Sequence, residues 1–351
     1  MGKRLLILTA GMGAGHDEVA AELARRLAPD GFDAAVVDVL DLLPLRLGRG
    51  LRRFYHGMIL RTPWLYGALY RRFFVPSGPP RVSPLVVWMA ARLDRALRGR
   101  PPDAVVSTFH LAAQVAGRLR ESGRLPAASI VLVTDFAVHR LWLHRGNDRY
   151  LCPDEAAART VTAATGRPAT GCAPLVRPQF RRDARPVAEF RSADRPVLVS
   201  AGSWGVGEVA ETMRVLARSG RYLPVVLCGR NERLIRRLRG AGAGLVLGWR
   251  DDIADLMAGA YAFVDNAAGL SCREAFARGL PVVSYRPIPG HGRDGARAMA
   301  DSGVSVYART PAELLDALDG LADPSTRDRQ VARAYALFDA PAAEQVVTAS
   351  A

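Results

Sequence analysis

A histidine behind a glycine-rich turn is the first residue along the chain that is placed like a catalytic base. Residues 5–8 are an apolar run, Gly13 and Gly15 follow, and His16 comes just before a helical pattern over residues 17–27. A neutral imidazole at the start of a helix can take a proton from a hydroxyl group. The positive helix end disfavours the imidazolium and so keeps the base form available. A capping or packing role is the alternative.

The same turn loosely matches a dinucleotide-binding fingerprint. Asp38, at the end of the next predicted strand, is about where a ribose-binding acid would lie. No Gly-Lys-Ser/Thr follows the glycines, so the turn is not a P-loop. An NAD-dependent oxidoreductase is therefore one interpretation, although a second glycine-rich half is hard to fit to it.

The second half carries glycine and polar residues behind several predicted strands. The first group suits a diphosphate and consists of Gly202, Ser203, Trp204 and Gly205. Later groups are Gly229, Arg230 and Asn231, then Gly248, Trp249 and Arg250, and then Gly269, Leu270 and Ser271 at the start of a helix. Glu274 is one turn further on, where its carboxylate can bind a ribose diol. A capping-box pairing with Ser271 is the alternative. The pattern predicts a nucleotide-diphosphate pocket.

Strands and helices alternate in both halves, and this order positions the candidate residues. Predicted strands are 5–8, 34–40, 103–108 and 129–134 in the first half, and 196–200, 223–229, 244–247, 261–264 and 280–284 in the second. Alternating units of this kind require right-handed crossovers and a parallel sheet. Two series predict two doubly wound, Rossmann-like α/β domains. Ligands of such domains collect at the carboxyl ends of the strands, so we expect a cleft between facing domains.

Residues 42–93 interrupt the alternation. They contain nine Arg, no Asp or Glu, and many large apolar side chains, and Arg52, Arg53, Trp64 and Tyr66 are among them. A basic face opposite Trp, Phe and Leu is typical of a helix in a membrane interface, where each Arg contributes about 1 kcal/mol. A helical excursion packed on the core is the first alternative. Nucleic-acid binding is the second, and the lack of common RNA-binding signatures disfavours it.

The composition is that of a globular protein with two domains. The 351 residues carry a net charge of +14, and residues 1–180 hold 25 basic against 14 acidic residues, so we expect an anionic partner there. No apolar run reaches the roughly 18 residues of a membrane-spanning helix, and the run near the start is too short for a signal peptide. Cys152, Cys172, Cys228 and Cys272 form no C-x-x-C pair, which argues against structural zinc and a disulfide framework.

In their order along the chain, these motifs resemble glycosyltransferase family 28, which has the two-domain GT-B fold. The second half carries the resemblance in Gly229-Arg230-Asn231, Gly248-Trp249, Glu274-Ala275 and Gly279-Leu280-Pro281. The first half is similar to monogalactosyldiacylglycerol synthases and processive diacylglycerol glucosyltransferases in Gly13-Ala14-Gly15-His16, in Pro63-Trp64-Leu65-Tyr66-Gly67, and in Thr134-Asp135 with His139 and Trp142. The similarity covers about residues 3–310.

The resemblance implies inverting transfer of a sugar from a UDP-sugar to a lipid hydroxyl, with no metal and no cofactor. It makes His16 the base or the residue that orients the acceptor, and it places Asp135 near the acceptor as the alternative base. Residues expected to contact the acceptor or the membrane are Gly13, Gly15, Arg52, Arg53, Trp64, Tyr66, His139 and Trp142.

On the donor side the resemblance implies a role for each group of the second half. Uracil would lie at Gly248, Trp249 and Arg250, ribose on Glu274, and the diphosphate on residues 202–205 and on Gly269, Leu270 and Ser271, beside Gly229, Arg230 and Asn231. The donor sugar would contact Gly290 and His291. The family commonly has Gln at the second of these positions, and an Asn four residues later where this chain has Gly295.

We therefore expect an N-terminal acceptor- and membrane-facing domain at 1–178, a linker at 179–194, a nucleotide-sugar-binding domain at 195–330, and a C-terminal helix and tail at 331–351. The partners would be a UDP-sugar, a diacylglycerol-like lipid and an anionic membrane surface, with no nucleic acid. The chain would be cytoplasmic and peripherally associated with the inner face of the plasma membrane. The alternatives are a soluble glycosyltransferase acting on a secondary metabolite, and a non-catalytic nucleotide-sugar- or lipid-binding protein.

Overall fold

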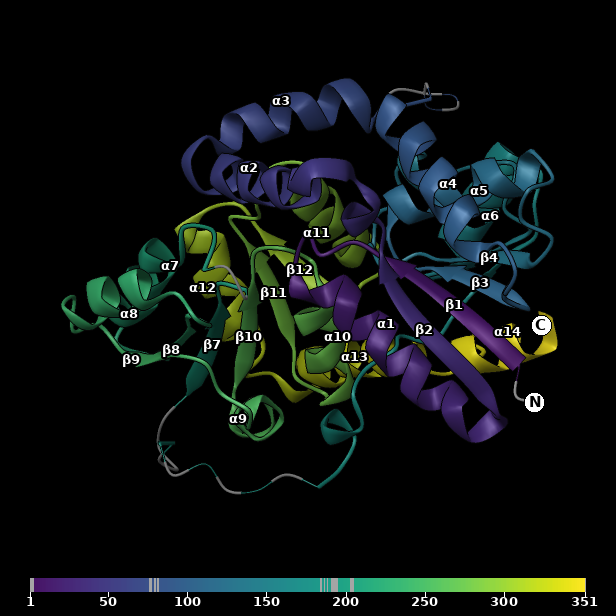
Figure 1. Ribbon diagram of the computed structural model, residues 1–351. Coiled ribbons are helices and arrows are strands. Elements are labelled where there is room, and N and C mark those ends of the chain that lie inside the picture. The colour runs from purple at the N-terminus through teal and green to yellow at the C-terminus, as the bar shows by residue number, and fades with distance from the viewer. Residues whose placement is uncertain are drawn as a thin grey trace. The chain divides into compact units, whose positions relative to one another are not determined.

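The chain forms two α/β units. The computed structural model describes residues 3–75, 78, 80, 82–183, 185, 187, 189–190, 195–202 and 205–350. Unit 1 comprises Met1–Leu175 and Leu337–Ala351, and unit 2 comprises Val176–Ala336. Each unit contains a six-stranded parallel sheet with helices (Figure 1), which confirms the predicted fold class.

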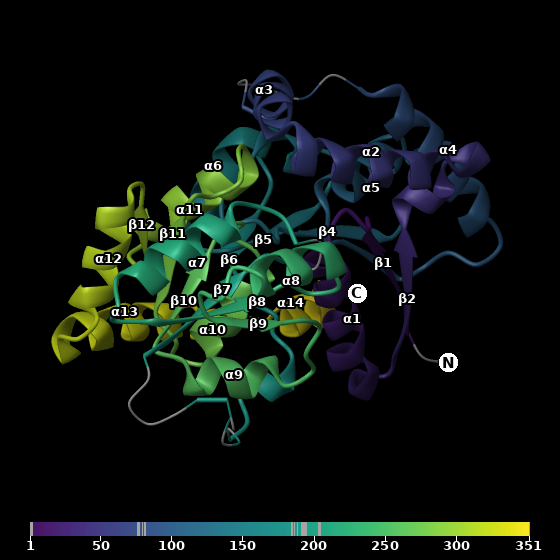
Figure 2. The ribbon, with the colours of Figure 1, turned by 90° about the vertical axis from the view of Figure 1, so that its left-hand side faces the viewer.

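The sheet of unit 1 has the strand order β2-β1-β3-β4-β5-β6. Its strands are β1 (Lys3–Thr9), β2 (Phe32–Asp38), β3 (Ala104–Ser107), β4 (Ala128–Leu132), β5 (Arg149–Cys152) and β6 (Ala169–Gly171). Helices α1 (Ala14–Leu27) and α14 (Ala343–Ser350) contact one face, and α4 (Pro84–Leu97) and α5 (His110–Glu121) cover the other, as Figure 2 shows. The sequence pattern did not predict β5 or β6.

Between β2 and β3 the chain leaves the sheet and forms α2 (Leu47–Arg61), α3 (Pro63–Phe73) and α4. Thr62 separates the first two helices with φ −136° and ψ 57°, because the proline that follows disfavours helical backbone at this position. The segment is therefore helical, as both the membrane-interface interpretation and the packed-excursion alternative require. None of the described helices is both long enough and apolar enough to cross a bilayer.

The sheet of unit 2 has the strand order β12-β11-β10-β7-β8-β9. Its strands are β7 (Pro196–Ser200), β8 (Leu223–Leu227), β9 (Leu245–Leu247), β10 (Ala262–Asp265), β11 (Val282–Tyr285) and β12 (Ser305–Ala308). Its helices are α7 (Val209–Arg218), α8 (Glu232–Arg239), α9 (Ile253–Gly259), α10 (Leu270–Ala277), α11 (His291–Asp301), α12 (Pro311–Gly320) and α13 (Pro324–Ala336). In unit 1, helix α6 (Glu155–Thr165) precedes β6. The short 3-10 turns of unit 1 are η1 (Ala28–Asp30), η2 (Val39–Leu42), η3 (Pro44–Arg46) and η4 (Arg140–Trp142). Unit 2 has η5 (Pro178–Phe180).

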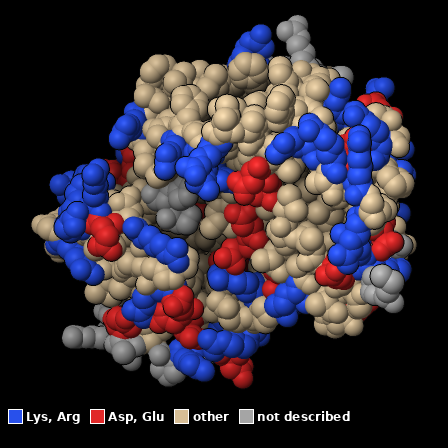
Figure 3. Space-filling model, viewed as in Figure 1, with Lys and Arg blue, Asp and Glu red and all other residues tan. Residues whose placement is uncertain are grey.

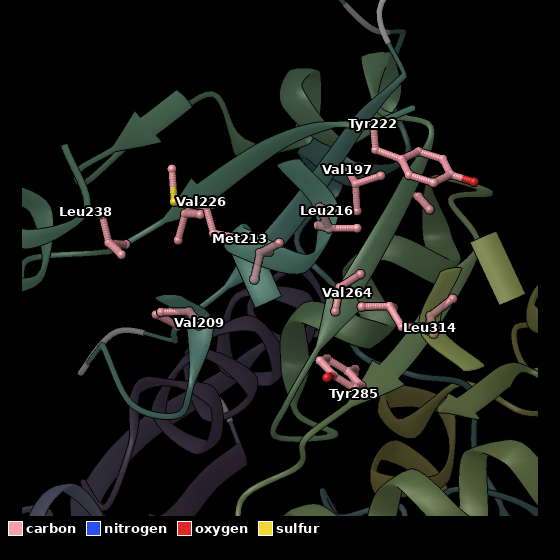
Figure 4. Packing of buried hydrophobic residues seen from close by; sticks show 14 of the residues in the cluster. Val197, Val209, Met213, Leu216, Tyr222, Val226, Leu238, Val264, Tyr285 and Leu314 are labelled. Carbon is pink, nitrogen blue, oxygen red and sulfur yellow. The ribbon is translucent and has the colours of Figure 1, made fainter. Parts of the chain in front are cut away.

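The central strands of unit 2 are continuous apolar runs because both of their faces are covered. Val197 on β7 and Val264 on β10 are buried against Met213 and Leu216 of α7, as Figure 4 shows. Such burial fixes where each strand ends, and therefore where the loop that follows each strand emerges.

The chain ends on unit 1, although α13 lies in unit 2. Ala343 and Val347 of α14 are buried, and α14 contacts β3 and β4. Glu344 pairs with Arg26 of α1 at 3.2 Å, and the backbone N–H of Ala173 donates to the carbonyl of Pro341 at 3.0 Å. The predicted segment 331–351 is thus divided between the units.

Candidate active site

The glycine turn after β1 places His16 in the first turn of α1, as predicted. Gly13 precedes the helix with φ 153°, a conformation that residues with a side chain rarely adopt. Gly15 and His16 are the second and third residues of the helix, and both are partly buried. The glycine at position 13 is therefore required by the backbone of the turn.

The ring of His16 is held by residues that follow two other strands. Its Nδ1 lies 2.7 Å from the hydroxyl oxygen of Thr134, which comes after β4. Phe109, after β3, packs edge-on against the imidazole with the ring centroids 4.8 Å apart. Because β1, β3 and β4 are neighbours in the sheet, three strand ends fix this ring.

Asp135 follows Thr134 directly, and two other residues of unit 1 contact its carboxylate. Its Oδ2 accepts a hydrogen bond of 2.8 Å from the indole of Trp142 and lies 3.5 Å from Nε2 of His139. Trp142 is completely buried and His139 nearly so. His139 and Trp142, two of the residues predicted to contact the acceptor or the membrane, therefore support the Asp135 carboxylate.

An aromatic cluster connects this segment to α2 and α3. The rings of Phe74 and Tyr70 lie 4.8 and 6.2 Å from that of His139. Tyr66, also predicted as an acceptor contact, is buried and packs edge-on against Tyr55. Burial, with a contribution from nearby Asp135, raises the pKa of Tyr55 to about 12, so that phenol is neutral at physiological pH. The excursion is therefore joined to the candidate catalytic segment.

The outer surface of the excursion is apolar and basic. Of the fifteen large hydrophobic side chains exposed in the described part of the chain, eleven lie between residues 45 and 88. They are Leu45, Leu47, Phe54, Leu60, Trp64, Phe73, Val75, Val82, Leu85, Val87 and Trp88. Figure 3 shows a largely uncharged area over α2 and α3 with basic residues at its border. Trp64 is 70% exposed, and Arg53 is exposed as well.

Arg52 differs from Arg53 because carboxylates already bind it. Its guanidinium lies 2.5 Å from Asp38 and 3.0 Å from Asp41. Asp38 also accepts hydrogen bonds of 2.8 Å from the backbone N–H groups of Gly11 and Leu40. These contacts tie α2 to the end of β2. They also occupy the carboxylate on which the dinucleotide interpretation depends.

In unit 2, Gly202 and Gly205 of the turn after β7 have different roles. Gly202 has φ 64°, and no atom of the described residues lies within 4 Å of where a Cβ would stand. Gly205 has φ 66°, and a Cβ there would lie 2.6 Å from the side-chain amide of Asn231. Gly202 therefore leaves room for a ligand, whereas Gly205 is needed for packing. Ser203 and Trp204 lie outside the described residues.

The capping-box interpretation of Ser271 and Glu274 is wrong. Helix α10 begins after Gly269 without a side-chain cap, so Leu270 and Ser271 are its first two residues. Glu274 is 4% exposed, and its Oε1 accepts a hydrogen bond of 2.9 Å from Nη2 of Arg177. Sequence reasoning missed Arg177, which precedes η5, because its partner is 97 residues away.

The residues after β8 and β9 form a second small group. Gly229 has φ 57°, and the guanidinium of Arg230 stacks 4.1 Å above the ring of half-exposed Trp249. Asn231 caps α8 by accepting the backbone N–H of Leu234. A flat aromatic and cationic surface of this kind is suited to a base or a phosphate.

Gly248 and Arg250 frame that surface. A Cβ at Gly248 would lie 3.3 Å from Ile235, so a larger residue would press on α8. Arg250 forms two hydrogen bonds with Asp252, of 2.5 and 2.7 Å, and one of 2.7 Å with Glu189. These bonds raise the pKa of the guanidinium and fix its position.

The N-termini of α10 and α11 lie at the edge of this sheet where its strands have their carboxyl ends. Gly290 has φ 78° and caps α11, whose first residue is His291, while Gly269 caps α10. Because β7, β10 and β11 are neighbours, the turn at Gly202 lies at the same edge. A small pocket there is lined by Ser200, Glu208, Asp265, Asn266, Tyr285 and Arg286, among others. Free N–H groups of helix N-termini bind phosphates well. Within the described ranges, no three His, Cys, Asp or Glu are placed to hold a metal ion.

Comparisons with known proteins bear on the fold and on the family resemblance. The sequence model of the monogalactosyldiacylglycerol (MGDG) synthase family matches residues 16–170. The processive diacylglycerol beta-glucosyltransferase of Bacillus subtilis is 26% identical over 93% of this chain and 89% of its own. MurG of Acinetobacter baumannii is 15% identical with a TM-score of 0.60, covering 99% of both chains. Anabaena HepE in complex with UDP-glucose is 12% identical with a TM-score of 0.55, covering 99% of this chain and 97% of its own. The predicted resemblance and the GT-B fold are confirmed.

Proposed function

Because residues 16–170 match the sequence model of the monogalactosyldiacylglycerol synthase family, we propose that the chain transfers a sugar from a UDP-sugar to the hydroxyl of a diacylglycerol-like lipid. The transfer takes place at a membrane surface and inverts the anomeric centre. The curated relative from Bacillus subtilis is named for beta-glucosyl transfer to diacylglycerol, which supports the acceptor and the product configuration.

The surface of the excursion is the observation that carries this proposal. Its exposed Phe54 and Trp64, with exposed Arg53 next to Phe54, offer a membrane interface both apolar and positive contacts. Helix α3 packs through Tyr70 on His139 of the Asp135 segment, and Thr134, next to Asp135, contacts His16. A lipid acceptor held by these helices therefore has its hydroxyl on the unit that carries the base. A water-dissolved metabolite would need no such surface.

Unit 2 supports the donor assignment. A UDP-sugar would place its diphosphate at the helix starts after Gly269 and Gly290 and at the open backbone of Gly202. Anabaena HepE, which shares the fold, has been solved with UDP-glucose. Glu274, on the second turn of α10, is the acid for the ribose diol, and Arg177 orients its carboxylate.

The mechanism is a single displacement. The acceptor oxygen attacks the anomeric carbon on the face opposite the diphosphate while His16 takes the hydroxyl proton. One carbon–oxygen bond forms to the lipid, and the carbon–oxygen bond to the diphosphate breaks. UDP then leaves with the bonding electron pair. Backbone N–H groups at the helix starts stabilise the charge that develops on the diphosphate.

The direct test combines the purified protein with anionic vesicles that contain diacylglycerol and with radiolabelled UDP-glucose or UDP-galactose. We expect label in a lipid product with a β linkage, as NMR coupling of the anomeric proton shows. A thermal-shift panel of UDP, TDP and GDP identifies the nucleotide independently, because a ligand at 100 times its Kd stabilises by roughly 2.7 kcal/mol. Absence of lipid product with every donor would contradict the proposal.

A further inference from the structure

The hydroxyl of Thr134 has two neighbours within hydrogen-bonding distance, but it can donate only one hydrogen bond. Its Oγ1 lies 2.7 Å from Nδ1 of His16 and 3.2 Å from the backbone carbonyl of Thr108. The threonine is only 8% exposed, so water does not compete freely for either contact. Which neighbour receives the proton decides how the imidazole is protonated.

The chemistry of the two neighbours settles the direction. A carbonyl oxygen can only accept a hydrogen bond, whereas a neutral imidazole nitrogen either donates or accepts, depending on the tautomer. If the Thr134 proton turned to His16, the buried carbonyl of Thr108 would lose a donor. If it points to Thr108, Oγ1 accepts from an Nδ1–H of His16 and both contacts are made. Leaving a buried polar group unsatisfied costs about 1–3 kcal/mol, so the second arrangement is favoured.

The surroundings hold this arrangement in place. Thr108 follows β3 and Thr134 follows β4, so the carbonyl, the hydroxyl and the imidazole come from three neighbouring strand ends. Phe109, which also follows β3, packs against the His16 ring. The ring is thus restrained in both position and tilt.

We propose that Thr134 is a positioning residue that fixes His16 in the Nδ1–H tautomer. The lone pair then resides on Nε2, which is the nitrogen that takes the acceptor proton. This inference rests on the proposed function for its catalytic consequence, but the tautomer itself is a property of unit 1. After proton transfer the imidazolium still donates its Nδ1–H to Thr134, so the contact is kept along the reaction.

The test reads the tautomer and the reaction separately. Nitrogen NMR of protein labelled at histidine distinguishes protonated from unprotonated ring nitrogens, and a His16→Gln variant identifies the signals of His16 among the six histidines. We expect Nδ1–H in the wild type and a mixture or the Nε2–H form in Thr134→Val. Thr134→Ser restores the wild-type tautomer because it keeps the hydroxyl.

Thr108→Val is the matched control, because it removes a neighbouring buried hydroxyl and keeps the carbonyl that receives the Thr134 proton. Its tautomer should match the wild type. In the transfer assay, Thr134→Val lowers kcat about ten-fold or more at unchanged KM for the UDP-sugar, and Thr134→Ser recovers it.

An Nε2–H tautomer in the wild type, or an unchanged tautomer in folded Thr134→Val, would overturn the proposal. If Thr134→Val does not fold, the wild type and Thr134→Ser still decide the question. An Nδ1–H tautomer in a protein that transfers no sugar would support the Thr134 assignment and contradict the proposed function.

Discussion

The side chains of the candidate site in unit 1 are of two kinds: those proposed to react, and those that orient the reacting groups. His16 is partly buried and bonded to Thr134, whereas Trp142 is completely buried beneath Asp135. A base has to reach its substrate, but a residue that orients a carboxylate works best without solvent. His16 is therefore the base in the proposed mechanism and Asp135 the alternative, whereas Trp142 holds the Asp135 carboxylate in place.

Replacing His16 with Ala should abolish sugar transfer and leave UDP affinity within a few-fold. The imidazole takes a proton only in the transition state, and general-base catalysis contributes roughly 100- to 10,000-fold. Steady-state transfer and UDP titration calorimetry, each on the variant and the wild type, measure the two effects. Wild-type activity in His16→Ala would remove this residue from the mechanism and leave Asp135 as the base.

Replacing Glu274 with Ala should weaken UDP binding about ten-fold or more, because a carboxylate with two ribose hydrogen bonds contributes roughly 1.5–3 kcal/mol. It also removes the partner of Arg177, so the melting temperature is recorded with the Kd. The control is Glu232→Ala, which replaces an exposed residue at the start of α8 and should change neither the Kd nor the melting temperature. A lower melting temperature with an unchanged Kd would show that Glu274 serves only to pair with Arg177.

At the scale of elements, α2 and α3 have two different sides. The inner side packs Tyr70 on His139 of the Asp135 segment, and the outer side exposes Phe54, Trp64 and Phe73. Arg140 donates a hydrogen bond of 2.7 Å to the carbonyl of Phe73 and holds the end of α3. A membrane contact on the outer side would therefore act close to the catalytic segment.

Replacing both Phe54 and Trp64 with Ser should reduce flotation with anionic vesicles about ten-fold or more, because burying each large apolar side chain contributes roughly 1.5–3 kcal/mol. Binding of the wild type should also fall in 1 M salt, where the screening length is only about 3 Å. Val306→Ser, an exposed apolar residue on β12 of unit 2, is the control. Equal flotation of all three proteins, in low and high salt, would contradict a membrane role for α2 and α3.

At the scale of the whole molecule, the chain is threaded through unit 1, unit 2 and unit 1 again. Helix α14 covers β3 and β4, the two strands whose loops supply Phe109 and Thr134 to the His16 ring. Helix α14 therefore supports the two strands that position these residues, from the face of the sheet that it covers.

Replacing Val347 with Ala should destabilise unit 1 by about 2 kcal/mol, since it deletes two buried methyl groups and leaves a cavity. Val346→Ala, one residue earlier and only partly buried, is the matched control and should cost well under 1 kcal/mol. Urea unfolding is followed by tryptophan fluorescence, to which buried Trp142 of this unit contributes. The same loss in both variants would mean that α14 is not packed as described.

The sequence by itself determined the two α/β units, most of their strands and the place of His16 at the start of a helix. These features depend on local patterns: apolar runs of strand length, glycines at the turn and helical periodicity. The resemblance to a glycosyltransferase family also came from short motifs. The weak patterns of β5, β6 and β12 were too short to predict strands, and Val306 on β12 is exposed rather than buried.

Only the tertiary structure decided which side chains meet. Thr134 and His16 are 118 residues apart, Arg177 and Glu274 are 97 apart, and α14 lies far along the chain from the strands it covers. Such contacts follow from strand order, which brings distant loops to one edge of a sheet without leaving a pattern in any single segment. Arg52 and Arg53 also differ only in the folded chain: carboxylates bind Arg52, whereas Arg53 is exposed. The reason is that neighbouring residues on a helix face different surroundings.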